Sequence, residues 1–181
     1  MHVSRRQACF FIAASCAAAL TGCAAHNGRK LVEPPAPVTG MSVMIEANAP
    51  IAWHDVAEKE HAGLDKVVQL FMAELGKNIA PGFAGTSIPV KLRIPGAALP
   101  PELPYVLVIK PVDADVILNG GKIAGLRTID LDVSLVHIAQ KLPVWHYKTL
   151  LDGNPKRPMT PQVQAIADAM IDQGLIPAAA R

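Results

Sequence analysis

Apolar and polar residues alternate along several stretches of this chain, which is the pattern of β-strands with one buried face. The alternation is clearest in four stretches: residues 41–48, 88–94, 128–138 and 142–151. Residues 105–109 are apolar throughout, as in a strand covered on both faces, and residues 112–118 continue that strand or form another. Pro89 lacks a backbone donor, and Lys91 and Arg93 are charged; both features favour an edge position for residues 88–94.

Residues 128–138 and 142–151 are close enough in sequence to form a hairpin around a three-residue turn at residues 139–141. This register places apolar residues opposite apolar ones and opposite charges across the strands. It pairs Leu135 with Trp145, Val133 with Tyr147, and Asp132 with Lys148.

Two stretches have the spacing of amphipathic helices. Apolar residues recur every three or four positions from Trp53 to Ile79, and Gly63 is predicted to divide this helix into a short and a long part. Thr160 is the predicted cap of a second helix that runs to Ile171 with a proline in its first turn.

Strands, helices and hairpin together predict an α+β domain. One mixed, largely antiparallel sheet of four to six strands, with two helices packed on one face, buries these patterns best. An open sheet with the helices on opposite faces is the alternative.

The N-terminal residues have a different character. Residues 1–22 have the three parts of a secretory signal: Arg5 and Arg6, an apolar run over residues 10–20, and small residues at the end. The run is too short to span a bilayer as a helix. The sequence therefore predicts export from the cytoplasm.

Leu20-Thr21-Gly22-Cys23 resembles the lipobox of bacterial lipoproteins. The resemblance implies transfer of a diacylglyceryl group to the Cys23 sulfur, cleavage before Cys23, and attachment to a membrane by lipid. Two or more acyl chains hold a protein stably in a bilayer. Ala24 follows Cys23 where retention in the inner membrane would require Asp, which resembles an outer-membrane address facing the periplasm.

Residues 23–40 are predicted to form the lipidated Cys23 and a proline-rich, extended tether, and residues 41–181 a single domain. The tether would lift the domain some tens of ångströms above the membrane.

Composition narrows the function of that domain. Seventeen basic and 15 acidic residues become 15 of each when Arg5 and Arg6 leave with the signal, so the sequence favours no nucleic-acid partner. All three cysteines lie at or before Cys23, which leaves the domain without a thiol for disulfides, catalysis or metal binding.

Candidate catalytic residues are scattered. His54 and His61 are about 10 Å apart along a helix, and the predicted register points His137 and His146 to opposite faces. Two pairs of acids, Asp113 with Asp115 and Asp130 with Asp132, would hold Ca²⁺ only if their strands are neighbours, and a solvated face is the simpler interpretation. We therefore predict no catalytic residue, no cofactor and no metal ion.

The segments Leu131-x-Val133-x-Leu135 and Pro143-Val144-Trp145 resemble a hairpin of small periplasmic lipoproteins, among them accessory proteins of ABC transport and envelope assembly. The resemblance implies a non-enzymatic module that binds an envelope protein. Its candidate contact surfaces are the proline-rich loop from Pro95 to Pro104 and the edge at Pro89-Val90-Lys91.

Two alternatives follow from the same residues. A carrier of a lipid or other apolar ligand would need a cavity between helices and sheet, lined by Leu64, Val68, Phe71, Val133 and Leu135. A small hydrolase would need a site near His137 or the two acidic pairs.

Overall fold

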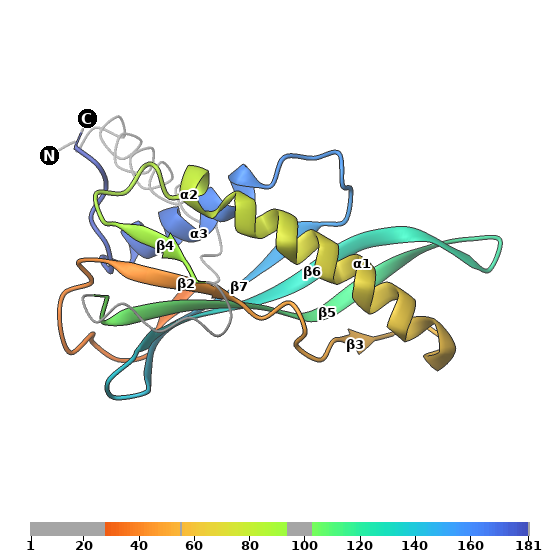
Figure 1. Ribbon diagram of the computed structural model, residues 1–181, viewed down its shortest axis with the longest axis horizontal. Coiled ribbons are helices and arrows are strands. Elements are labelled where there is room, and N and C mark those ends of the chain that lie inside the picture. The colour runs from red at the N-terminus through yellow and green to blue at the C-terminus, as the bar shows by residue number, and fades with distance from the viewer. Residues whose placement is uncertain (1–27, 55, 94–102, 181) are drawn as a thin grey trace, which may run out of the picture.

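The computed structural model describes residues 28–54, 56–93 and 103–180. Seven strands and three helices occur within these ranges (Figure 1). In chain order they are β1 (Gly28–Lys30), β2 (Met41–Ile45), β3 (Ala52–Trp53), α1 (Glu58–Lys77), α2 (Ile79–Gly82), β4 (Val90–Leu92), β5 (Tyr105–Asn119), β6 (Lys122–His137), β7 (Leu142–Asp152) and α3 (Thr160–Asp172).

The strands form one mixed sheet in the order β1-β7-β6-β5-β2-β4, and β3 pairs with β5 off this path. The neighbours β1–β7, β7–β6 and β6–β5 are antiparallel, whereas β2 is parallel to both β5 and β4. The α+β class and the mixed sheet are therefore confirmed, and so is the edge position of β4. The expected number of strands was too low, because β1 and β3 are short strands in segments without alternation.

The register of the β6–β7 hairpin is the predicted one. Leu135 is opposite Trp145, Val133 is opposite Tyr147, and Asp132 is opposite Lys148. The connection spans residues 138–141, one residue longer than expected at its start, and Lys141 takes a positive φ of 51° there. A bulge at Val144 follows, and it leaves both Val144 and Trp145 buried.

Strand β5 is continuous through Lys110 and Pro111, so residues 112–118 continue the strand of residues 105–109. Pro111 lies opposite Leu131, and a register shift follows it directly. Gly120 and Gly121, with φ of 57° and 77°, form a two-residue turn to β6 that requires glycine-like conformations at both positions. The resulting β5–β6 hairpin extends beyond the rest of the molecule (Figure 1).

The helices differ from prediction at their ends. Helix α1 passes through Gly63 without division and begins at Glu58, while Trp53 belongs to β3. The N-cap of α3 is Met159, not Thr160, whose hydroxyl instead donates to Asn78 Oδ1 at 2.7 Å. The four-residue helix α2 was not expected and raises the number of helices from two to three.

All three helices lie on one face of the sheet, as predicted (Figure 1). Tyr105, Leu107 and Ile109 point to this face and belong to one core cluster with the buried residues of α1 and α3. Val106, which lies between them on β5, points to the opposite face and is not part of that cluster. No helix within the described residues covers the opposite face, which we call the open face.

The predicted tether is wrong for residues 28–40. Gly28–Lys30 is strand β1, antiparallel to β7, and Val38 is buried in the core. The Tyr105 hydroxyl donates to the Ala36 carbonyl at 2.5 Å and accepts from the Ala36 N–H at 3.3 Å. These contacts fix the proline-rich run to the domain, so residues 28–40 belong to it.

Candidate partner-binding surfaces

The sequence-predicted site residues are only partly within the described structure. Cys23 lies outside the described residues, as does most of the loop from Pro95 to Pro104. The segment Pro89-Val90-Lys91 lies at the edge of the sheet in and beside β4.

The hydrogen bonds of β4 show which of its backbone groups are available for pairing. The Met41 N–H donates to the Pro89 carbonyl at 3.1 Å, and the Arg93 N–H donates to the Val43 carbonyl at 2.7 Å. Because successive residues of a strand direct their backbone groups to opposite sides, Val90 and Leu92 direct theirs away from β2. Within the described residues these groups face no strand, so β4 is an open edge.

A groove of about 500 Å³ adjoins this edge, where β2 continues beyond the end of β4. Its lining comes from the end of β2, the turn that follows, and the residue after β4: Met44, Ile45, Glu46, Ala47, Asn48, Ala49 and Arg93. The Arg93 guanidinium contacts Met44 Sδ at 3.6 Å. Backbone edge and apolar groove together can accept an extended peptide, with the edge supplying hydrogen bonds and the groove a side-chain pocket.

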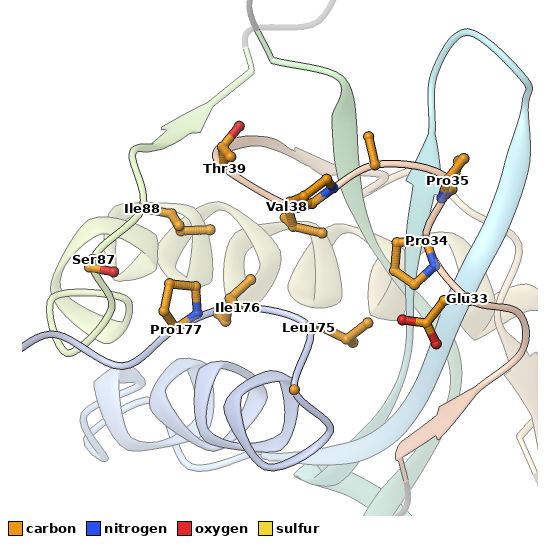
Figure 2. A pocket seen from close by; sticks show the side chains of 13 residues that line it. Glu33, Pro34, Pro35, Val38, Thr39, Ser87, Ile88, Leu175, Ile176 and Pro177 are labelled. Carbon is orange, nitrogen blue, oxygen red and sulfur yellow. The ribbon is translucent and has the colours of Figure 1, made fainter.

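A larger groove of about 770 Å³ lies between the proline-rich run and the segment after α3 (Figure 2). Proline rings and aliphatic side chains form most of its walls: Pro34, Pro35, Pro37, Val38, Ile88, Leu175, Ile176 and Pro177, with Glu33, Ala36, Thr39, Ser87 and Gly174. Sequence reasoning missed this groove because it assigned residues 33–39 to a free tether. The proline clusters at residues 34–37 and at Pro177 were the available signal.

Backbone hydrogen bonds hold the walls of this groove in place. Thr86 and Ala178 form a β-bridge, and the Ala179 N–H donates to the Gly85 carbonyl at 2.8 Å. On the other wall, Glu33 forms an ion pair with Lys30 at 3.2 Å. The groove can bind a ligand or peptide through apolar contacts and complementary shape. Among its lining residues we find no pair of groups for acid–base chemistry.

The four histidines considered above do not form a common site. His54 Nε2 lies 3.0 Å from Asp113 Oδ2, while His61 Nε2 lies 3.2 Å from the Val56 carbonyl. The His137 ring contacts the Tyr105 ring at a tilt of 59°, with ring centroids 5.1 Å apart. His137 and His146 lie on opposite faces of the sheet, as predicted. His146 is opposite Ser134, and Ser134 is an odd number of residues from His137 along β6.

Ser134, Asp132 and His146 come together on the open face, but not as a catalytic triad. Asp132 Oδ1 accepts from Ser134 Oγ at 3.3 Å and lies 3.1 Å from His146 Nε2. In a nucleophilic triad the histidine stands between the hydroxyl and the carboxylate. The carboxylate stands between them here, so the Ser134 hydroxyl donates to Asp132 and not to the His146 imidazole.

The acidic pairs are on neighbouring strands, which was the condition for a shared site. Asp113 lies opposite Asp130, and Asp115 lies opposite Thr128, whereas Asp132 is drawn to His146. Burial, and then the charges of Asp113 and Asp115, raise the pKa of the Asp130 carboxyl. No group of three or more potential ligands among the described residues is arranged to hold a metal ion.

The five residues proposed to line an apolar cavity are all buried in the core cluster: Leu64, Val68, Phe71, Val133 and Leu135. None of them lines either of the two grooves described above. The described residues also include no helix with the length and apolar character needed to cross a bilayer.

No protein-family model matches the sequence, and no curated protein matches it. Two solved structures illustrate what the fold is similar to. The PelC dodecamer from Paraburkholderia phytofirmans aligns with a TM-score of 0.37 and 10% identity, over 79% of this chain and 93% of that chain. Protein XCC0632 from Xanthomonas campestris, of family DUF330, aligns with a TM-score of 0.40 and 10% identity, over 81% of this chain and 90% of that chain. Similarity at this level does not establish a common family or function.

Proposed function

We propose that this chain is a lipid-anchored, non-enzymatic module of the cell envelope that binds a protein partner at the edge of its sheet. The lipobox Leu20-Thr21-Gly22-Cys23 is the observation that carries the anchoring part of the proposal. It stands directly after a charged and then an apolar segment, as processing requires. Ala24 after the cysteine supports the periplasmic side of the outer membrane as the location.

Labelled palmitate tests the anchor. The wild-type chain should incorporate label and fractionate with the outer membrane, whereas Cys23→Ser should incorporate none. Equal labelling of the two chains would refute lipidation at Cys23. Label that fractionates with the inner membrane would leave the anchor standing and refute the proposed address.

The open edge of β4 supports the partner-binding part of the proposal. An extended segment of a partner would add to the sheet beside Val90 and Leu92, whose backbone groups point outward. The adjoining groove at Met44 and Ile45 would then receive one of its side chains.

Replacing an edge residue with proline tests this mode of binding. Val90→Pro removes an outward-pointing N–H and leaves the hydrogen bonds between β4 and β2 in place. A photo-crosslinker placed at Lys91 in the wild-type chain should form an adduct with an envelope protein, and the adduct should be lost with Val90→Pro. Lys122→Ala, at the exposed first residue of β6 in the distant hairpin, is the surface control and should keep the adduct. An adduct that forms equally in the Val90→Pro chain would refute strand addition.

A further inference from the structure

The β5–β6 hairpin ends in an apolar segment. Between Val116 and Leu126 the only charged residue is Lys122, and most of the others are aliphatic or glycine. This end of the hairpin extends beyond the rest of the molecule, and Gly120 and Gly121 close it in a two-residue turn (Figure 1). We call residues 116–126 the hairpin tip.

The hairpin tip exposes a large apolar side chain on each of its two faces. Val116 points to the helix-covered face, because it packs against the core cluster. The irregularities beyond this point place their extra residue in β6, so side chains keep alternating along β5. Ile117 therefore points to the open face and Leu118 to the helix-covered face. Ile117 is 42% exposed and Leu118 is 52% exposed, and Gly125 opposite Ile117 has no side chain to cover it.

Exposure on both faces indicates what kind of partner fits the tip. A protein docked against one face would leave the apolar side chain of the other face in water. The interfacial region of a bilayer surrounds an inserted segment and covers both side chains at once. Insertion has to be shallow, because within the described residues no third strand flanks the tip. The outer backbone groups of the tip are then unpaired, and the hydrocarbon core does not accept such groups.

The charges near the tip agree with shallow insertion. Lys122 is exposed at the start of β6, where its ammonium group can contact a lipid phosphate. The nearest carboxylate along β5 is that of Asp115, four residues before Asn119 at the end of the strand. This separation is roughly 13 Å along the strand. Interfacial segments are buried by about 5–10 Å, so Asp115 and the acids behind it stay in water and limit the depth of insertion.

Strand β1 directs its N-terminal end toward the same end of the sheet. It is antiparallel to β7, and its first residue, Gly28, lies opposite Tyr147 and nearest to the Asp152 end of β7. Asp152 lies opposite Thr128, next to the hairpin tip. Cys23 precedes Gly28 by five residue steps. An anchor at Cys23 would therefore hold Gly28 within about 18 Å of the bilayer.

We propose that the hairpin tip is a second membrane contact, buried in the interfacial region of the phospholipid bilayer that carries the anchor. This inference rests on the proposed lipidation of Cys23, which brings the domain to the bilayer. Ile117 and Leu118 supply the apolar contact, and Lys122 binds lipid phosphates. Strand β4 lies beside the start of β2, which pairs with the start of β5, so this contact leaves the open edge of β4 far from the surface.

Single thiols can locate the end of the sheet that contacts the bilayer, because Cys23 is the only cysteine after the predicted signal. Asn119→Cys and Gln140→Cys are a matched pair: each replaces an exposed amide at a hairpin turn, and the two turns are at opposite ends of β6. The lipidated chains, each with a fluorophore on the new thiol, are reconstituted in vesicles of phosphatidylethanolamine and phosphatidylglycerol. A spin label near the top of the lipid acyl chain then quenches any fluorophore in the interfacial region.

We expect strong quenching at position 119 and little at position 140. Replacing both Ile117 and Leu118 with serine should shift the insertion equilibrium by about fivefold for each side chain, because about half of each is already covered in the free protein. Val67→Ser combined with Leu70→Ser removes a similar exposed apolar pair from α1 and should leave the quenching at position 119 unchanged.

A second variant tests the same contact without changing the apolar residues. Lys122→Glu places a carboxylate at the turn and should also reduce the quenching at position 119. Equal quenching at positions 119 and 140 would overturn the inference and leave the anchor intact, and so would quenching at 119 that survives the double serine substitution. Chains that do not associate with the vesicles would refute lipidation at Cys23, and this inference with it.

Discussion

The two hydrogen bonds between the Tyr105 hydroxyl and Ala36 make a sharp test of how residues 28–40 are held. Tyr105 is fully buried, and its hydroxyl is the polar group that joins the proline-rich run to the sheet. Tyr105→Phe removes both bonds and keeps the ring in the core. Ala36 is exposed, so its freed N–H and C=O can bond to water, and the loss stays near the ordinary net value of a hydrogen bond.

Each such bond contributes about 0.5–1.5 kcal/mol, so the free energy of unfolding should fall by about 1–3 kcal/mol. For a domain of this size, each kcal/mol lowers the melting temperature by roughly 2–4 °C. Thermal and denaturant unfolding measure that loss. Hydrogen exchange adds the local information: the Ala36 amide should be protected in the wild type and should exchange much faster in the variant.

Tyr147 is the matched control because it is the only other tyrosine, and its hydroxyl has no hydrogen-bond partner among the described residues. Tyr147→Phe should leave both the stability and the Ala36 exchange rate unchanged. If Ala36 exchanges freely in the wild-type protein, or if both phenylalanine variants behave alike, residues 28–40 are a free tether after all.

Two further substitutions test the packing and the charges of the sheet. Asp130→Asn removes the like charge opposite Asp113 and should stabilise the protein at neutral pH by roughly 0.2–1 kcal/mol. The folded-state pKa of Asp130 is raised, so the stability of the wild type relative to the variant should fall as pH rises from the ordinary value of 3.8 through the folded value. Below 3.8 the two proteins should unfold alike. A variant no more stable than wild type at neutral pH would contradict this. Gly153→Ala would place a Cβ 2.5 Å from the Leu126 carbonyl oxygen and should destabilise by about 1–3 kcal/mol in denaturant unfolding, whereas Gly125→Ala meets open space and should cost far less. Equal losses for the two glycines would show that the close approach at Gly153 is not the cause.

The sequence predicted best where two patterns constrain each other. The β6–β7 register followed from matching Trp145 and Tyr147 to an apolar row and Lys148 to Asp132, since a slip of one residue would invert every side chain. Such cross-strand agreement is local information. It needs no knowledge of the rest of the fold.

Prediction failed where distant segments decide the structure. Gly28–Lys30 has no alternating pattern, and it becomes a strand because β7, more than a hundred residues later, offers an edge beside Trp145. Trp53 fits a helical stripe by spacing, yet pairing with Ala114 on β5 places it in β3. The larger groove was missed for the same reason, because its two walls meet only in three dimensions.

The grouping of acidic residues on the open face was partly predictable from the sequence. The acidic pairs were recognised as pairs, and their strands are indeed neighbours.

Strand β1 has a mechanical consequence for an anchored protein. It is held to β7 by three residue pairs and is the first part of the domain to receive any load applied at Cys23. If a partner pulls the domain away from the bilayer, β1 and the proline-rich run before Val38 would peel off before the core is disturbed, because Val38 is itself part of the core. The free connection would then lengthen from the five residue steps between Cys23 and Gly28 to the fifteen between Cys23 and Val38, and its reach from about 18 Å to about 50 Å. In a chain anchored at Cys23, the segment would thus store slack: it would keep the domain close to the membrane at rest and let the domain follow a partner that moves outward.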